Sequence, residues 1–158
     1  MIAGLEQYVG QSISQICSFY GTAPHINNCA HFVSHALSYR IQGAALCSNV
    51  AGTTCDYKHR HEGFCIRVDQ VFNSLSNRGN WPEKPPTGQK IAVAMLKSNF
   101  VDDANFLIGD QPKKHIGIFH QGLIYNFSNS NHIVKKSPVD HFKTLYGVGT
   151  ILLIADLP

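Results

Sequence analysis

The sequence predicts an α+β protein, with helices in its first half and an antiparallel sheet in its second half. Up to about residue 75 apolar residues recur at helical spacing, and from residue 91 onward they fall in short runs of strand length. Residues 81–88, which hold three of the seven prolines, separate the two halves. The 158 residues suffice for one domain with a hydrophobic core and are few for two. We therefore expect a single domain over 1–158.

Three helices are expected in the first half. Leu5, Val9, Ile13, Ile16, Cys17 and Tyr20 share a helical spacing, which predicts an amphipathic helix that ends near Gly21. Residues 22–28 are typical of a loop, and a second helix is expected from Cys29 to about Ile41. Residues 43–63 show little apolar periodicity, and a third helix is expected around 68–75.

Six short strands are expected in the second half. They are Ile91–Leu96, Phe106–Ile108, His115–Phe119, Leu123–Phe127, Ile133–Lys135 and Thr150–Ile154. The sequence His120-Gln121-Gly122 predicts a tight hairpin between two of them, with glycine where φ is positive. Pro138–Leu145 is expected to form one helical turn.

Cys29 is the candidate nucleophile. It shares one face of the second helix with Phe32, Val33 and Ala36, and Asn28 before it is a favourable N-cap residue. A thiol in the first helical turn lies near unpaired backbone N–H groups and the positive end of the helix dipole. Both stabilise a thiolate, and the same N–H groups can hold an oxyanion. The alternative is a small buried thiol at a helix start.

His115 is the candidate base because it opens an apolar strand, with Ile116 and Ile118 on the opposite face. Gly117 permits close approach of a neighbouring backbone. The next strand carries Asn126, whose amide oxygen is expected to accept the imidazole N–H across the hairpin. Ser128 and Asn129 are alternatives for this third residue. His120 is a rival base. It lies five residues after His115, and because side chains alternate along a strand it points away from the face of His115.

Four segments together resemble the NlpC-type and CHAP-type cell-wall peptidases. They are Tyr20-Gly21, Asn28-Cys29-Ala30-His31-Phe32-Val33, His115-Ile116-Gly117-Ile118-Phe119 and Tyr125-Asn126-Phe127-Ser128. The resemblance covers about a third of the chain. It implies a papain-like fold in which a helix carries the nucleophile, a strand carries the base, and the next strand carries the third polar residue. It implies no cofactor.

The resemblance has departures. NlpC-type enzymes usually place aspartate before the cysteine and Ser-Gly after it, whereas Asn28 and Ala30-His31 stand here. Their third residue is usually histidine, whereas Asn126 stands here, as asparagine does in papain. These differences bear on the bond that is cleaved more than on the chemistry.

The resemblance implies a cysteine amidase or endopeptidase that cuts an amide bond in the stem peptide or crosslink of peptidoglycan. Tyr20, His25 and Asn28 are the expected substrate-binding residues, Tyr20 at the position where these families hold an aromatic residue. The alternatives are that Tyr20 completes the apolar stripe of the first helix and that His25 is an ordinary loop histidine. The first six residues lack the pattern of a signal peptide. A compact member of this kind resembles the amidase toxins that bacteria inject through the type VI system, made in the cytoplasm and acting in the periplasm of a target cell. A cognate immunity protein would then cover the Cys29 cleft, and a phage endolysin is the nearest rival.

Composition restricts the other classes of partner. The net charge is +3, and the chain has no block of Lys and Arg, which argues against nucleic acid. The longest apolar runs, 91–96 and 151–155, are far shorter than the ~20 residues of a membrane span. We expect a monomer. Two other hypotheses remain: a non-catalytic binding protein with a core stapled by cysteines, and a thiol hydrolase or transferase acting on another amide.

No metal is expected from the sequence. His31 and His35 lie at i and i+4 but on the side of their helix away from Cys29, so we expect them to face solvent. Cys47, Cys55 and Cys65, with His59 and His61, lack the paired spacing of zinc sites. Disulfides or plain thiols are the interpretation for these cysteines and for Cys17, and their pairing stays open. The acidic pair Asp102-Asp103 has no third ligand nearby and is interpreted as solvated.

Overall fold

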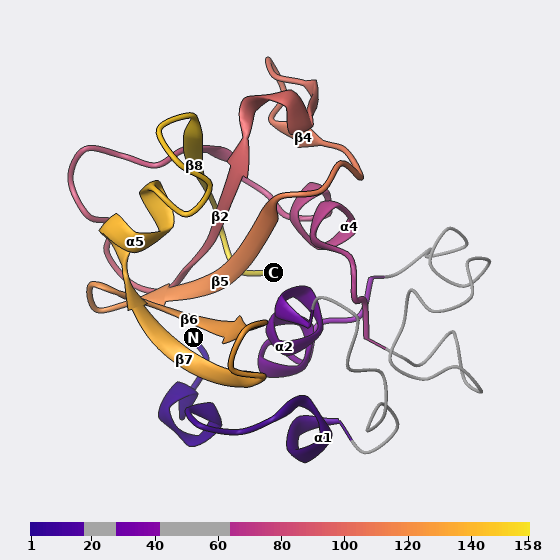
Figure 1. Ribbon diagram of the computed structural model, residues 1–158, viewed down its shortest axis with the longest axis vertical. Helices are drawn as coiled ribbons and strands as arrows, with labels where there is room; N and C mark the ends of the chain where they lie inside the picture. The colour runs from indigo at the N-terminus through magenta and orange to yellow at the C-terminus, as the bar shows by residue number, and fades with distance from the viewer. Residues whose placement is uncertain (18–27, 42–63) are drawn as a thin grey trace.

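The computed structural model describes residues 1–17, 28–41 and 64–158. In this part the chain has an α+β architecture, as the sequence predicts. A six-stranded antiparallel sheet has the strand order β1-β8-β2-β5-β6-β7, and a separate two-stranded ribbon pairs β3 with β4 (Figure 1). The papain-like assignment and the single domain stay predictions.

The strands agree with the sequence prediction to within a few residues wherever an apolar run marks them. The sheet consists of Gly79–Asn80 (β1), Lys90–Leu96 (β2), Lys114–His120 (β5), Leu123–Ser128 (β6), Ile133–Pro138 (β7) and Thr150–Ala155 (β8). The ribbon consists of Phe100–Asp102 (β3) and Leu107–Ile108 (β4). β1 and β3 were not expected, because strands of two and three residues are too short to show a period.

The predicted helix from Leu5 to Gly21 is wrong over its described part. The chain forms a 3₁₀ turn, Leu5–Tyr8 (η1), and a single helical turn, Ile13–Ile16 (α1). Gly10 lies between them with φ +84°, outside the right-handed helical region. Its N–H donates to the carbonyl of Val134 at 2.8 Å, and the N–H of Val134 donates to Gln11 at 2.9 Å. These bonds to the edge strand β7 replace the hydrogen bonds that a continuous helix would make.

The other helices are Cys29–Ala36 (α2), Val68–Asn73 (α4), Val139–Lys143 (α5) and the 3₁₀ turn Lys97–Asn99 (η2). α2 ends five residues before the predicted Ile41. Ser38 takes a positive φ of 49°, and the N–H of Tyr39 donates back to the carbonyl of Ser34 at 3.0 Å. This is the left-handed termination that closes many helices.

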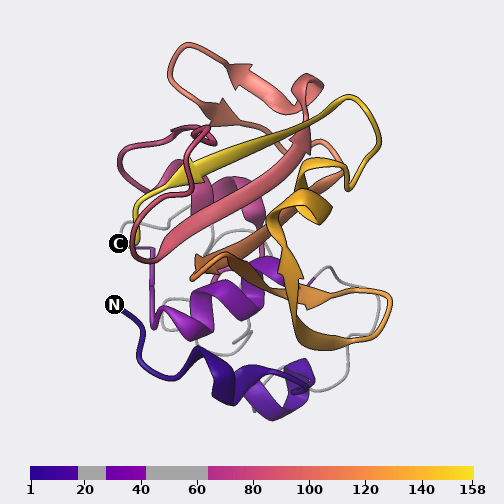
Figure 2. The ribbon, with the colours of Figure 1, turned by 90° about the vertical axis from the view of Figure 1, so that its left-hand side faces the viewer.

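The two faces of the sheet are covered by different helices (Figure 2). α2 and α4 pack on one face, where Phe32, Phe72, Ile116 and Ile118 belong to the larger buried cluster. α5 packs on the other face through Phe142, in a smaller cluster with Ala92, Ala94, Phe119, Ile124 and Leu152. Because side chains alternate along a strand, His115 shares the face of Phe119, and its ring centroid lies 5.4 Å from that of Phe142.

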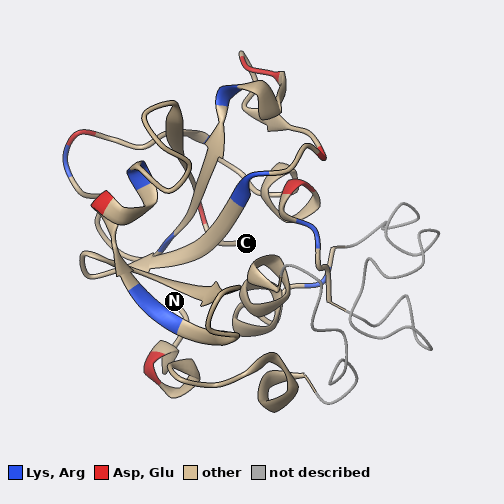
Figure 3. Cartoon of the chain, viewed as in Figure 1, with Lys and Arg blue, Asp and Glu red and all other residues tan. Residues whose placement is uncertain are grey.

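The charged residues are scattered over the described part of the chain and do not gather along one element (Figure 3). None of the described helices has the length and apolar character that a bilayer span requires.

Candidate functional site

Cys29 is the first residue of α2 and is completely buried, with Asn28 at the N-cap position as predicted. The Asn28 side chain, however, makes no capping hydrogen bond to the backbone. Its Oδ1 instead lies 3.3 Å from Nδ1 of His31, one turn along the helix. The carboxamide of Asn28 therefore does not compete for the backbone N–H groups of the first turn.

His115 and Asn126 form the hydrogen bond that the hairpin predicts. The register of β5 and β6 pairs Gly117 with Asn126, so His115 and Asn126 are diagonal neighbours on one face. Nε2 of His115 lies 3.1 Å from Oδ1 of Asn126. Nδ2 of Asn126 donates to the carbonyl of Ile124 at 3.0 Å and to Oγ of Ser137 at 2.9 Å. These two bonds fix the orientation of the amide, so its oxygen faces the ring.

The orientation of Asn126 also fixes the tautomer of His115. An amide oxygen only accepts, so Nε2 of His115 carries the hydrogen and Nδ1 carries the lone pair. Burial lowers the pKa of His115, the hydrogen bond from the ring to Asn126 raises it, and the nearby Lys135 and His141 lower it. The net direction is downward, so the ring is neutral at neutral pH. A neutral imidazole with a defined basic nitrogen is what a general base requires.

Gly117 permits the close packing of β5 on β6 beside this pair. A Cβ at this position would lie 2.5 Å from Cγ2 of Ile124, 2.7 Å from the carbonyl oxygen of Tyr125 and 3.1 Å from Cβ of Asn126. The hairpin that connects the strands has φ 49° at Gln121 and 85° at Gly122. Positive φ at both positions is the type I′ turn, whose twist matches that of a two-stranded antiparallel ribbon.

The His115–Asn126 pair opens onto a pocket of about 420 Å³. Its remaining lining residues are Ser128, Asn129, Ser130, Lys135, His141, Phe142, Leu145 and Tyr146. Of the alternatives to Asn126, the Ser128 hydroxyl bonds instead to Ser130 and Asn131.

Three residues around the His115–Asn126 pair are not predicted as site residues from the sequence. Ser137 holds Asn126 from β7, and Phe142 and Tyr146 reach the pocket from α5 and the loop after it. The register of β7 brings Ser137 close, and this register depends on a strand pairing that local sequence does not specify.

Cys29 and His115 are not joined by a hydrogen bond, although the structure describes both residues. Cys29 packs in the larger cluster with Ile116 and Ile118, whereas His115 packs on Phe142 at the opposite face of β5. At the pocket, burial raises the pKa of Tyr146, and an ionised Cys29 would raise it further. Cys29 also raises the pKa of Lys114, which precedes His115, although burial lowers that pKa overall.

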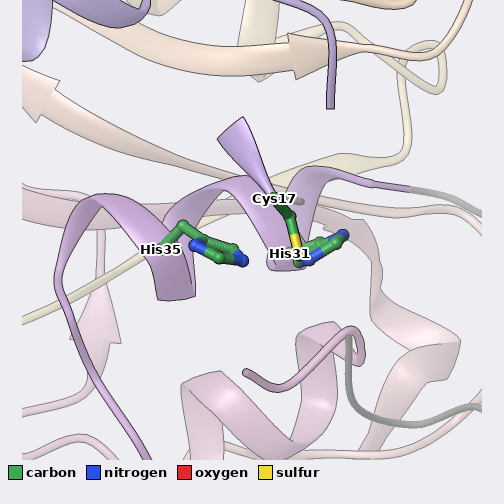
Figure 4. A group of neighbouring side chains, drawn as sticks. All are labelled: Cys17, His31 and His35. Atoms are coloured by element: carbon green, nitrogen blue, oxygen red, sulfur yellow. The ribbon is translucent and has the colours of Figure 1, made fainter. Parts of the chain in front are cut away.

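The expectation that His31 and His35 face solvent is wrong. His31 is completely buried and His35 is half-buried, with its ring centroid 4.1 Å from that of Phe64. The end of α1 covers the side of α2 that carries these rings, and this tertiary contact is invisible in a helical periodicity. Both rings lie close to Cys17, and the three side chains form one cluster (Figure 4).

Several predicted residues lie outside the described part of the chain. They are Tyr20 and His25 of the expected substrate site, and Cys47, Cys55, His59 and His61. Among Cys17, Cys29 and Cys65, the cysteines that are described, no two are joined by a disulfide. The rival base His120 ends β5 on the face opposite His115 and is not among the pocket residues.

No family model, no curated protein and no solved structure matches this chain. The candidate site consists of a thiol at a helix N-terminus and an oriented imidazole that opens onto a polar pocket.

Proposed function

We propose that this chain is a papain-like cysteine hydrolase that cleaves an amide bond in the stem peptide or crosslink of peptidoglycan. Cys29 is the nucleophile, His115 the base and Asn126 the residue that positions the base. The observation that carries the proposal is the 3.1 Å bond between His115 and Asn126. It holds a buried, neutral imidazole in one tautomer at the wall of a pocket, on a strand against which the Cys29 helix packs.

The chemistry follows from these roles. Nδ1 of His115 takes the proton of the Cys29 thiol, and the sulfur attacks the carbonyl carbon of the substrate, whose oxygen becomes an oxyanion. Backbone N–H groups at the start of α2 stabilise that oxyanion. The C–N bond then breaks as His115 protonates the leaving amine, and His115 activates a water that hydrolyses the thioester. No cofactor takes part.

This mechanism requires the thiol and the imidazole to meet when substrate binds. Catalytic hydrogen bonds are often long or unformed without substrate and tighten only in the complex. His115 lies second in β5 and Cys29 first in α2, so both are at element ends. Because they pack on opposite faces of β5, the mechanism requires the thiol to reach the imidazole around this end of the strand.

The pocket favours a polar substrate with carboxylate groups, as a stem peptide has. Ser128, Asn129 and Ser130 supply hydrogen-bonding groups, and Lys135 supplies a positive charge. We propose that the protein acts as an antibacterial toxin in the periplasm of a target cell, and that a cognate immunity protein covers this pocket. The cell-wall substrate and the delivery route rest on the resemblance to the NlpC-type and CHAP-type peptidases.

Digestion of purified sacculi tests the proposal. Wild type, Cys29→Ala, His115→Ala and the control His120→Ala are incubated with sacculi, and released fragments are identified by mass spectrometry. We expect wild type and His120→Ala to release the same stem-peptide fragments and the other two variants to release none. Full release by Cys29→Ala would contradict the assigned nucleophile, and no release by wild type would contradict the cell-wall substrate.

A further inference from the structure

Three metal-binding side chains converge where the end of α1 meets α2. Cys17 directly follows α1, and His31 and His35 lie one turn apart on α2 with both rings directed toward the Cys17 side chain (Figure 4). The sulfur of Cys17 and one ring nitrogen from each histidine all lie within 4.8 Å of one another. Cys17 is 1% exposed and His31 is completely buried, so two of the three side chains lie inside the protein and not on its surface.

The hydrogen bonds around the cluster leave imidazole nitrogens suited to a metal. Oδ1 of Asn28 lies 3.3 Å from Nδ1 of His31, and because an amide oxygen accepts, Nδ1 carries the hydrogen. Nε2 of His31 therefore carries the lone pair. Nε2 of His35 is buried without a hydrogen-bond partner among the described residues. A ligand histidine whose other nitrogen bonds to an oxygen is the usual arrangement around protein-bound metals.

An aromatic ring shields the cluster on one side. Phe64 covers the ring of His35 on one side, which limits the access of water.

We propose that Cys17, His31 and His35 form a binding site for Zn²⁺. One thiolate and two imidazoles are donors that zinc prefers and that Mg²⁺ and Ca²⁺ do not. Zn–S bonds of about 2.3 Å and Zn–N bonds of about 2.0 Å at tetrahedral angles separate the donor atoms by roughly 3.3–3.6 Å. Donors within 4.8 Å of one another reach this spacing through a contraction of at most about 1.5 Å. A tetrahedral zinc ion takes a fourth ligand besides these three.

The metal would add a link between α1 and α2. α1 is four residues long, and its Ile13 and Ile16 pack against the larger cluster while only partly buried. A bound ion would tie the chain at Cys17 to α2, whose first residue is Cys29. The zinc site does not depend on the proposed hydrolase activity, and either can fail without the other.

Metal titration tests this site. Protein freed of metal with a chelator is titrated with Zn²⁺ against a chromophoric chelator, and with Co²⁺, whose bond to a thiolate gives a charge-transfer band in the near ultraviolet. We expect one equivalent of Zn²⁺, a Co²⁺–thiolate band and a higher Tm with zinc. Cys17→Ser and His35→Gln should each weaken binding by about tenfold or more, and Cys17→Ser should also abolish the band. Circular dichroism checks that each variant folds, and the half-buried His35→Gln decides the question if Cys17→Ser does not fold.

One control separates this cluster from other donors in the chain. His120→Gln removes a histidine from the far end of β5 and should bind zinc as wild type does. The proposal is overturned if wild type takes up no stoichiometric zinc, or if His35→Gln binds unchanged. Loss of binding in His120→Gln with retention in Cys17→Ser would equally overturn it, because the metal would then be held elsewhere.

Discussion

Replacing Gly117 with alanine tests the packing that brings Asn126 to His115. The added Cβ would lie 2.5 Å from Cγ2 of Ile124 and 2.7 Å from the carbonyl oxygen of Tyr125. Ordinary contact begins near 3.4 Å, so these atoms must move away by roughly 0.7–0.9 Å. The oxygen belongs to the backbone of β6, so rotation of a side chain cannot relieve both contacts.

The expected cost of Gly117→Ala combines two effects. Overpacking in a close-packed interior costs about 1–3 kcal/mol. Displacement of β6 also strains the 3.1 Å bond between His115 and Asn126, and loss of a buried hydrogen bond costs about 1 kcal/mol. We expect Gly117→Ala to lower the free energy of unfolding by about 2–4 kcal/mol and to reduce hydrolysis even where the protein is fully folded.

Urea unfolding measures this cost through the fluorescence of Trp81, the single tryptophan of the chain. Its ring packs edge-on against Phe119 of β5, with centroids 5.1 Å apart. Gly79→Ala is the matched control, because Gly79 is also a strand residue but has no heavy atom within 4 Å of an added Cβ. The control should change stability by less than about 0.5 kcal/mol. If Gly117→Ala is as stable as Gly79→Ala, the close approach of the strands is not what the structure indicates.

Three further predictions concern the imidazole and its partner. Asn126→Ala should lower kcat by roughly tenfold or more and destabilise the fold by about 1–3 kcal/mol, because it removes the bonds to His115, Ile124 and Ser137. Ser137→Ala removes only one of these bonds, so its losses of kcat and of stability should both be smaller. The pKa of His115 is lowered in the folded state, so hydrolysis should persist below pH 6.5 and be lost as pH falls through that lowered value. In Asn126→Asp the carboxylate stabilises imidazolium, so the acid limb of the pH–rate profile should move to higher pH; an unmoved limb would assign it to another group. The lowered pKa of His115 also makes the free energy of unfolding depend on pH, because the unfolded chain binds a proton at His115 more readily than the folded chain does. Above pH 6.5 both states are neutral at this residue, and as pH falls from there toward the folded pKa the free energy of unfolding should decrease. Urea unfolding measures this decrease, which should be smaller in His115→Gln.

The second half of the chain was largely predictable because its signals are local. Apolar runs mark the strands β2, β5, β6 and β8, and Gln121-Gly122 marks the type I′ turn, which together fix the register of β5 on β6. That register alone places Asn126 beside His115. The start of α2 at Cys29 was also predictable from Asn28 at the N-cap position, although the Asn28 side chain lies against His31 and makes no capping hydrogen bond.

The first half was less predictable because tertiary contacts override its periodicity. The backbone at Gly10 and Gln11 bonds to β7, which interrupts the apparent helix, and nothing in the local sequence indicates that pairing. The end of α1 buries His31 on a side of α2 that helical spacing assigns to solvent. The support of Asn126 by Ser137 likewise depends on which strand lies next to β6.

The proposed thiol–imidazole pair is tested most directly by the rate at which each cysteine reacts with iodoacetamide. Wild type, His115→Ala and His120→Ala are alkylated under native conditions, and peptide mass spectrometry follows each cysteine separately over time. If His115 activates Cys29, Cys29 reacts faster than Cys17 and Cys65 in wild type and in His120→Ala, and at least about tenfold more slowly in His115→Ala. A Cys29 that stays unmodified in folded wild type, or that reacts equally fast without His115, would contradict the proposed catalytic pair.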